Sequence, residues 1–475
     1  MMKKRITLIA LVLIATLIAG CSANSTMSSE STPGRISSSS SSDYSSPGSA
    51  GTSPAAPAAS APAPSASPSA ASSSAASSSA SSSFSDSGDS LAAPAPSAEA
   101  AGAMSSSYDM SIAEAEYPAD GLYTEEYDGD YPGQEYLYVR PGLLTAGEWN
   151  DNRNYYFILD LIQTNEDWRE FEQRWLFNIT KRVQVSVFDG DKPVVNAKVD
   201  LLDENQSAVF SAQTDNSGIA YLFVSLMSAS TNQVAYIRAS TTVSETQVFD
   251  PYVMQYEFDL PAARQARSLD LMLVIDTTGS MSDELEFLKS ELDNVIQQVA
   301  KDNANIPVRL SINVYRDIGD DYVVRSMPFE KDIGNQLVFL NAQSAHGGGD
   351  FEEAVEIALA DAIDGHDWNN DATARIILLV LDAPPHNTPQ IRDEMHRLTA
   401  AAAEKGIRII PIASSGIDKN TEFLLRCLSM GTGGSYVFLT DDSGIGYSHI
   451  EPTIGEYQVE LLNELLVRLL NEYLQ

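Results

Sequence analysis

A run of five apolar residues, Leu271 to Ile275, most constrains what this chain can fold into, because a helical pattern follows it almost at once. An uninterrupted apolar run of this length is typical of a strand that is buried on both faces, as in a parallel sheet. The apolar residues that come next recur at helical spacing and are Leu285, Leu288, Leu292, Val295, Ile296 and Val299. The sequence therefore predicts a buried strand that turns directly into an amphipathic helix.

The same alternation continues over residues 267–475. Apolar runs rich in β-formers lie at 269–275, 308–315, 322–327, 375–381, 407–413 and 435–439. Helical patterns lie between or after them at 281–301, 331–341, 351–364, 389–405, 420–430 and 455–474. Alternating strands and helices predict an α/β fold with a doubly wound, mostly parallel sheet that carries helices on both faces. A segment of about 200 residues is long enough to bury such a core.

Three oxygen-bearing side chains follow the first strand at alternate positions: Asp276, Thr278 and Ser280. Open parallel sheets bind ligands at the carboxyl ends of their strands. One carboxylate with two hydroxyls forms an oxygen-only set, which suits a hard divalent cation such as Mg²⁺. The same residue types are also common in turns and helix caps, so this motif alone leaves both interpretations open.

Two further loops carry polar residues next to strands or helices. One is the run His346-Gly-Gly-Gly-Asp350, which precedes the helix expected at 351–364. The other is Asp382-Ala-Pro-Pro-His386, which ends the apolar strand before it. Because parallel strands point the same way, Asp276 and Asp382 are expected to meet at one edge of the sheet. Asp350 has two open interpretations, a further metal ligand or the N-cap of the helix that follows it.

Taken in this order, the three motifs resemble those of a von Willebrand factor type A (VWA) domain, over about 265–475. The resemblance implies a doubly wound sheet with a metal-ion-dependent adhesion site, most simply for Mg²⁺, although Ca²⁺ and Mn²⁺ also suit oxygen ligands. The ligands that it implies are Asp276, Thr278, Ser280, Asp350 and Asp382. Adhesive members of the family carry a threonine where this chain has Asp350. A third carboxylate would make the centre net negative and less attractive to an acidic partner.

The first 21 residues predict export. Lys3, Lys4 and Arg5 precede the apolar run Ile6 to Ile18, and the sequence Leu-Ile-Ala-Gly-Cys at 17–21 resembles a bacterial lipobox. We expect a lipoprotein signal peptide, with Cys21 carrying acyl chains such as palmitate, and a location in the bacterial cell envelope facing away from the cytoplasm. A plain signal peptide with an incidental cysteine is the alternative.

The composition changes three times before the predicted α/β domain. Residues 22–107 are almost entirely Ser, Ala, Pro and Gly and predict a disordered tether. Residues 108–178 are acidic and rich in tyrosine, and end in a short helical cap. Residues 179–262 alternate with a period of two and predict a small β-sandwich. The runs after Phe188 and Thr214 resemble carboxypeptidase-regulatory-like modules, which usually serve as spacers or in adhesion.

The net charge restricts the possible partners, and the cysteine content restricts the possible disulfides. The formal net charge of −36 argues against nucleic acid as a partner and against direct contact with anionic lipid, so the membrane is reached only through the lipid anchor. The second cysteine, Cys427, lies in an apolar context typical of a buried thiol. With Cys21 acylated, no intramolecular disulfide is available.

Three classes of function follow. The first is a surface protein whose metal-dependent VWA face binds an extracellular or periplasmic protein, with an acidic side chain of the partner completing the metal shell. The second is a structural component of an envelope complex, in which the metal only stiffens loops. The third is a hydrolase that uses Ser280, His386 and Asp382. The chain has neither a Gly-Xaa-Ser-Xaa-Gly elbow nor a His-Glu-Xaa-Xaa-His motif, so we expect no enzyme.

Overall fold

The computed structural model describes residues 122–124, 137–226, 233–263 and 267–475. All described residues belong to one compact unit, Asp109–Gln475. The predicted signal peptide, Cys21 and the predicted tether lie outside the described residues. Within the described ranges, no helix has both the length and the apolar character needed to cross a membrane.

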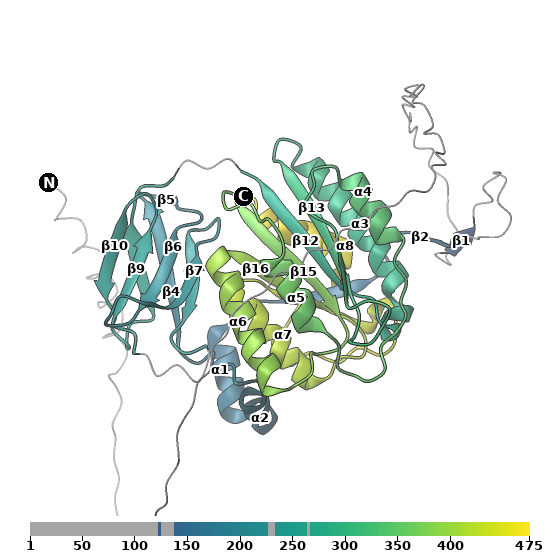
Figure 1. Ribbon diagram of the computed structural model, residues 1–475, viewed down its shortest axis with the longest axis horizontal. Helices are drawn as coiled ribbons and strands as arrows, with labels where there is room; N and C mark the ends of the chain where they lie inside the picture. The colour runs from purple at the N-terminus through teal and green to yellow at the C-terminus, as the bar shows by residue number, and fades with distance from the viewer. Residues whose placement is uncertain (1–121, 125–136, 227–232, 264–266) are drawn as a thin grey trace, which may run out of the picture. The chain divides into compact units, whose positions relative to one another are not determined.

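An eight-stranded sheet organises residues 145–149 and 269–461 (Figure 1). In spatial order its strands are β14 (Val324–Ser326), β13 (Val308–Tyr315), β12 (Leu269–Asp276), β15 (Ala374–Leu381), β16 (Ile407–Ala413), β17 (Tyr436–Leu439), β3 (Thr145–Trp149) and β18 (Glu460–Leu461). The strands from β13 to β17 in this order run parallel, whereas β14, β3 and β18 pair antiparallel to their neighbours. The sheet is therefore mixed, with a parallel centre.

Helices cover both faces of this sheet. On one side lie α3 (Leu285–Asp302), α4 (Ile333–Asn341) and α8 (Leu462–Glu472), and on the other α5 (Val355–Asp364), α6 (Pro389–Lys405) and α7 (Lys419–Thr432). Every residue of β12, β15 and β16 is buried, as their unbroken apolar runs predicted. Alternate residues of β12 enter different cores: Leu273 packs with α3 and α8, whereas Val274 packs with the helices opposite.

One strand of the sheet comes from far upstream in the chain. β3 pairs with β17 and with β18, so a segment before residue 150 belongs to the sheet. The helices α1 (Tyr155–Thr164) and α2 (Glu166–Trp175) follow, at the end of the segment for which a short helical cap was predicted. Trp149 lies in β3 and is buried. The strands between α2 and β12 therefore form an insertion between two strands of one sheet.

The insertion contains two four-stranded sheets. The first is β10 (Ser244–Val248), β9 (Tyr236–Ser240), β6 (Lys198–Leu202) and β7 (Ala208–Gln213); the second is β11 (Gln255–Asp259), β4 (Arg182–Asp189) and β5 (Lys192–Pro193), with β8 (Ile219–Phe223) paired to β4. Val185 of β4 and Ile237 of β9 belong to the same hydrophobic core. The likeness of this insertion to carboxypeptidase-regulatory-like modules stays a prediction. Upstream, β1 (Leu122–Thr124) and β2 (Leu137–Val139) pair antiparallel.

A buried carboxylate holds the start of β3 against α3. Glu291 is fully buried and accepts hydrogen bonds from the backbone N–H groups of Gly142, Leu143 and Leu144 at 2.7 to 3.0 Å. Gly142 has a φ of 81°, which a residue with a side chain rarely adopts. The glycine turn lets three successive N–H groups face one carboxylate, and this arrangement leads the chain into the edge of the sheet.

We expect Glu291→Ala to lower the free energy of unfolding by about 3 kcal/mol, because it leaves backbone donors without partners beside a buried strand. Urea denaturation followed by circular dichroism measures this change. The matched control is Asp293→Ala on the same helix, whose side chain forms an exposed hydrogen bond with Gln297. That control should cost about 0.5 kcal/mol or less. Equal losses in the two variants would contradict the assigned role of Glu291.

Candidate metal centre at the edge of the parallel sheet

Two aspartates meet at the carboxyl end of neighbouring parallel strands. Asp276 is the last residue of β12, and Asp382 directly follows β15. The two strands pair in parallel with Ile275 opposite Val380, so both carboxyl groups lie at the same edge of the sheet. Asp276 is 0% exposed and Asp382 is 4% exposed. Both carboxyl groups are therefore largely shielded from water.

The first loop folds back on Asp276. The backbone N–H and the hydroxyl of Thr278 both donate to Asp276 Oδ1, at 2.8 and 2.7 Å. The hydroxyl groups of Thr278 and Ser280 are 3.1 Å apart, because a 3₁₀ turn over Gly279–Asp283 begins between them. The other oxygen of Asp276, Oδ2, is buried and has no hydrogen-bond partner among the described residues.

A third buried acid, Glu353, lies near Asp276 and Asp382 at this edge of the sheet. The sequence analysis did not identify it. Glu353 is 2% exposed, and its Oε2 has no hydrogen-bond partner among the described residues. Its backbone N–H donates to the carbonyl of Pro384 at 3.0 Å, and it forms an isolated bridge with Pro385. The chain therefore stays extended at Glu353. The sequence signal was an acid four residues after the last glycine of the run, Gly349, at a position that the helical pattern assigned to a helix.

The pKa values show how unfavourable this arrangement is without a counter-charge. Burial is the main cause that raises the pKa of Asp276 to about 6, while hydrogen bonds from Thr278 lower it. Burial, and next the charge of Asp276, raises the pKa of Asp382 to about 7. Burial, followed by the charges of Asp276, Asp317 and Asp382, raises the pKa of Glu353 to about 9. Each acid opposes the ionisation of the others.

The donor set fits a hard divalent cation. Asp276 Oδ2, Asp382 Oδ1 and Glu353 Oε2 are buried atoms without a hydrogen-bond partner in the described part of the chain. The Tyr315 hydroxyl beside Asp276 is likewise buried without an ordinary hydrogen bond, although it is close enough to lower the pKa of Asp276. Unpaired buried carboxylates need protons or a cation. Oxygen ligands alone suit Mg²⁺, Ca²⁺ or Mn²⁺.

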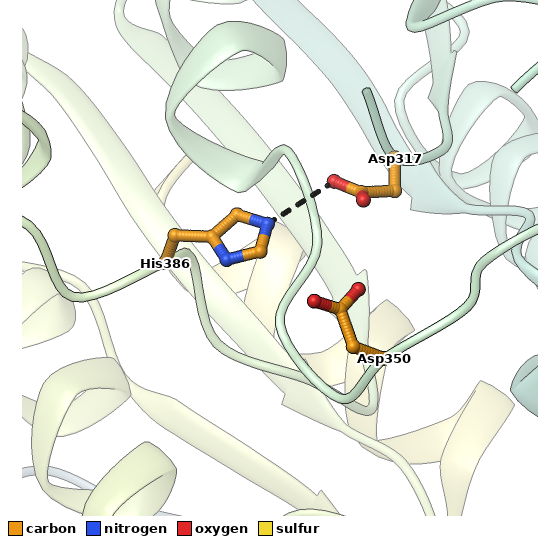
Figure 2. Close-up of side chains that lie close together, drawn as sticks. All are labelled: Asp317, Asp350 and His386. Carbon is orange, nitrogen blue, oxygen red and sulfur yellow. Dashed lines mark ion pairs between the residues drawn. The ribbon is translucent and has the colours of Figure 1, made fainter. Parts of the chain in front are cut away.

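Asp350 lies in a different group of side chains. One carboxylate oxygen of Asp350, one of Asp317 and one ring nitrogen of His386 lie within 4.8 Å of one another (Figure 2). The alternative role of Asp350 as a helix cap is wrong, because α5 begins at Val355 and its N-cap is Ala354. The bridge between Glu353 and Pro385 accounts for this late start, since it holds the preceding residues in an extended conformation. Whether Asp350 coordinates the ion at Asp276 stays a prediction.

The side chains named for the hydrolase alternative do not form a nucleophile set. His386 Nε2 lies 3.5 Å from Asp317 Oδ1, and the Ser280 hydroxyl lies against that of Thr278. In the described ranges no hydrogen bond joins Ser280 to His386, so the pair lacks the contact that would activate a serine. The geometry therefore gives this alternative no support.

Comparison with known proteins identifies a family for part of the chain. Residues 270–444 match the family model for the von Willebrand factor A domain. The chain contains a VWA domain. This finding confirms that part of the resemblance, and VWA domains typically mediate interactions between proteins. The matched range includes Asp276, Glu353, Asp382 and His386.

Two similar proteins illustrate how far the likeness extends. A protein of Acanthamoeba polyphaga mimivirus described as an ariadne-like RING finger protein is 28% identical over 214 residues, which cover 42% of this chain and 20% of that protein. The chain thus spans about a fifth of the length of that relative. The crystal structure of the conserved hypothetical protein BatB from Bacteroides thetaiotaomicron aligns with 43% of this chain and 98% of its own, with 13% identity and a TM-score of 0.31.

The raised pKa values predict how stability depends on pH when metal is removed. The folded protein keeps protons on Asp382 up to about pH 7, whereas the unfolded chain loses them near pH 4, so stability falls as pH rises between these values. In EDTA we expect the Tm to drop by several degrees from about pH 5 to about pH 8. Differential scanning calorimetry measures this slope.

Asp382→Asn should flatten the slope, because the amide carries no titrating proton. Asp321→Asn is the control, since the Asp321 side chain is 88% exposed. A Tm slope that is unchanged by Asp382→Asn would show that this carboxyl does not carry the repulsion. In saturating Mg²⁺ the wild-type slope should reverse or vanish, because the ion favours the charged carboxylates.

Proposed function

We propose that this chain is a lipid-anchored surface protein whose VWA domain binds a protein partner through a divalent cation. The observation that carries the proposal is the convergence of three buried carboxyl groups, each with an unpartnered oxygen, beside two hydroxyls at one sheet edge. The protein-binding part rests on the VWA domain itself, which typically serves such interactions. The metal is supported by the charge and chemistry of the donor set.

Asp276, Asp382, Thr278 and Ser280 would hold the ion, and Glu353 adds the third acid. Mg²⁺ is the ion that the oxygen-only set suits most simply, with Ca²⁺ and Mn²⁺ as alternatives. When bound, the ion would offer a position for an acidic side chain of the partner. This chain's own residues hold the carboxylates in place, exclude water from Asp276, and set the charge of the centre.

The protonation state of Glu353 determines the net charge of the proposed centre. Burial and neighbouring acids raise its pKa to about 9, so in the metal-free protein at neutral pH this group is protonated. With Glu353 protonated, Asp276 and Asp382 would leave a divalent centre near neutral and able to attract an acidic partner. With Glu353 ionised, the centre would be net negative. A protonated Glu353 would therefore favour capture of an acidic side chain, and an ionised Glu353 would oppose it.

The anchor and location are proposed from the N-terminal sequence. The basic residues Lys3 to Arg5, the apolar run after them and the lipobox-like end at Cys21 support lipidation at that cysteine. A tether over 22–107 would then separate the VWA domain from the membrane surface. The partner would be an extracellular or periplasmic protein. The net charge of −36 disfavours nucleic acid.

The metal part is tested by calorimetric titration of the full chain with Mg²⁺. Asp276→Ala should abolish measurable binding, because it removes an acid that no neighbour can replace. Glu353→Gln should keep Mg²⁺ affinity within about tenfold, because it imitates the protonated acid. Binding that is equal in wild type and Asp276→Ala would remove the ion from this site.

The partner part is tested on intact cells by crosslinking the full chain in Mg²⁺ and in EDTA. Crosslinked products should appear in Mg²⁺ for wild type and Glu353→Gln, and should be lost in EDTA and in Asp276→Ala. Products that are the same in all four samples would show that partner choice does not involve the metal, even where the titration detects an ion.

We expect Cys21→Ser to move the protein from the membrane fraction to the soluble fraction, because acyl chains supply the membrane affinity. Fractionation with radiolabelled palmitate measures both location and label. Ser22→Ala is the matched control at the neighbouring position and should leave both unchanged. A Cys21→Ser protein that remains on the membrane after a carbonate wash would contradict the anchor.

A further inference from the structure

Three side chains beside the proposed centre form a group of different chemistry. Asp317 follows β13, Asp350 precedes α5, and His386 follows β15, so the group draws on three separate loops. Figure 2 shows the two carboxylates and the imidazole pointing toward one another, with one ligand atom of each within 4.8 Å of the others. Such a spacing would let a single ion contact all three side chains.

The contact between His386 and Asp317 is a long ion pair. His386 Nε2 and Asp317 Oδ1 are 3.5 Å apart, longer than the usual hydrogen-bond distance of about 2.9 Å. Asp317 Oδ1 is a buried atom with no hydrogen-bond partner among the described residues. The imidazole nitrogen and this carboxylate oxygen thus face each other without an ordinary hydrogen bond, at a distance at which one ion could contact both.

A buried acid next to the group provides an independent observation. Glu356, in the first turn of α5, is 6% exposed, and its Oε2 has no hydrogen-bond partner in the described ranges. Burial raises its pKa; the charge of His386 lowers it, and that of Asp317 raises it further. The Glu356 carboxyl is thus within electrostatic reach of both side chains and places further negative potential on the group.

The loops that carry the group are tied together by hydrogen bonds. Asp320 Oδ2 accepts from the backbone N–H of Asp317 at 3.2 Å and from that of Gly348 at 2.8 Å. One side chain therefore joins the loop of Asp317 to the glycine loop that leads to Asp350. On the third loop, His386 follows Pro384 and Pro385, whose rings restrict the backbone. The three ligand atoms are positioned before any ion arrives.

We propose that Asp317, Asp350 and His386 form a second cation site, which takes a transition metal ion, Zn²⁺ foremost. The imidazole distinguishes this site from the oxygen-only centre at Asp276. Zn²⁺ and related ions bind imidazole nitrogen together with carboxylate oxygen, whereas Mg²⁺ and Ca²⁺ prefer oxygen alone. Three protein ligands would leave a coordination position open to water or to a partner group.

The test titrates the full chain with Zn²⁺ by calorimetry in a large excess of Mg²⁺, which occupies the first centre. Wild type should bind about one Zn²⁺, and His386→Gln and Asp350→Asn should each weaken it at least about 100-fold. His346→Gln and Asp321→Asn are the matched controls, because each removes an exposed residue of the same type from a neighbouring loop. Both should bind Zn²⁺ as wild type does, and the Tm of every variant checks its folding.

Cobalt supplies a second readout, because Co²⁺ that is bound to imidazole absorbs visible light. The bands should appear in wild type and in Asp276→Ala but be lost in His386→Gln. Zn²⁺ binding that survives both His386→Gln and Asp350→Asn would overturn the proposal. So would a wild-type chain that binds no Zn²⁺, or Zn²⁺ binding that Asp276→Ala abolishes while the His386 variant keeps it. The Asp276 variant thus separates failure at this site from failure at the first.

Discussion

The mutual repulsion of buried acids at the end of β12 and β15 is the constraint on which the rest of this VWA domain depends. Parallel pairing of the two strands places Asp276 and Asp382 at one edge, and the extended chain at Glu353 adds a third acid. Such a group is costly to bury unless protons or a cation compensate it. The pKa values near 6, 7 and 9 show that protons do so when metal is absent. In the proposed centre, the same residues would exchange these protons for an ion.

The sheet that carries this edge is completed from outside the segment that matches the VWA family. β3 enters between β17 and β18, and Glu291 holds its approach through three backbone N–H groups. A buried ion pair adds to this attachment: Asp151, two residues after β3, binds Arg426 of α7, and both side chains are fully buried. The chain thus leaves the large sheet after β3, forms the inserted strands between α2 and β12, and returns to the same sheet at β12. A substitution that weakens the pairing of β3 should therefore destabilise both the inserted strands and the large sheet.

Sequence patterns predicted most of the VWA domain to within a few residues. The strands expected at 308–315 and 407–413 and the helix expected at 389–405 agree with the structure at both ends. These predictions succeeded because unbroken apolar runs and helical spacing report local burial directly. The helix expected at 351–364 begins only at Val355, because pairing with Pro385 competes with helix formation. That pairing joins loops far apart in the chain, so no local pattern could reveal it.

The sequence by itself determined the alternation of strands and helices, the acids at the ends of two strands, and the hydroxyls two and four residues after Asp276. These features depend on neighbours along the chain. Only the tertiary structure decided that β3 joins the sheet, that Glu353 faces Asp276, and that Asp350 meets Asp317 and His386. Those contacts depend on where loops after different strands converge, and convergence is a property of the packed sheet rather than of any stretch of sequence.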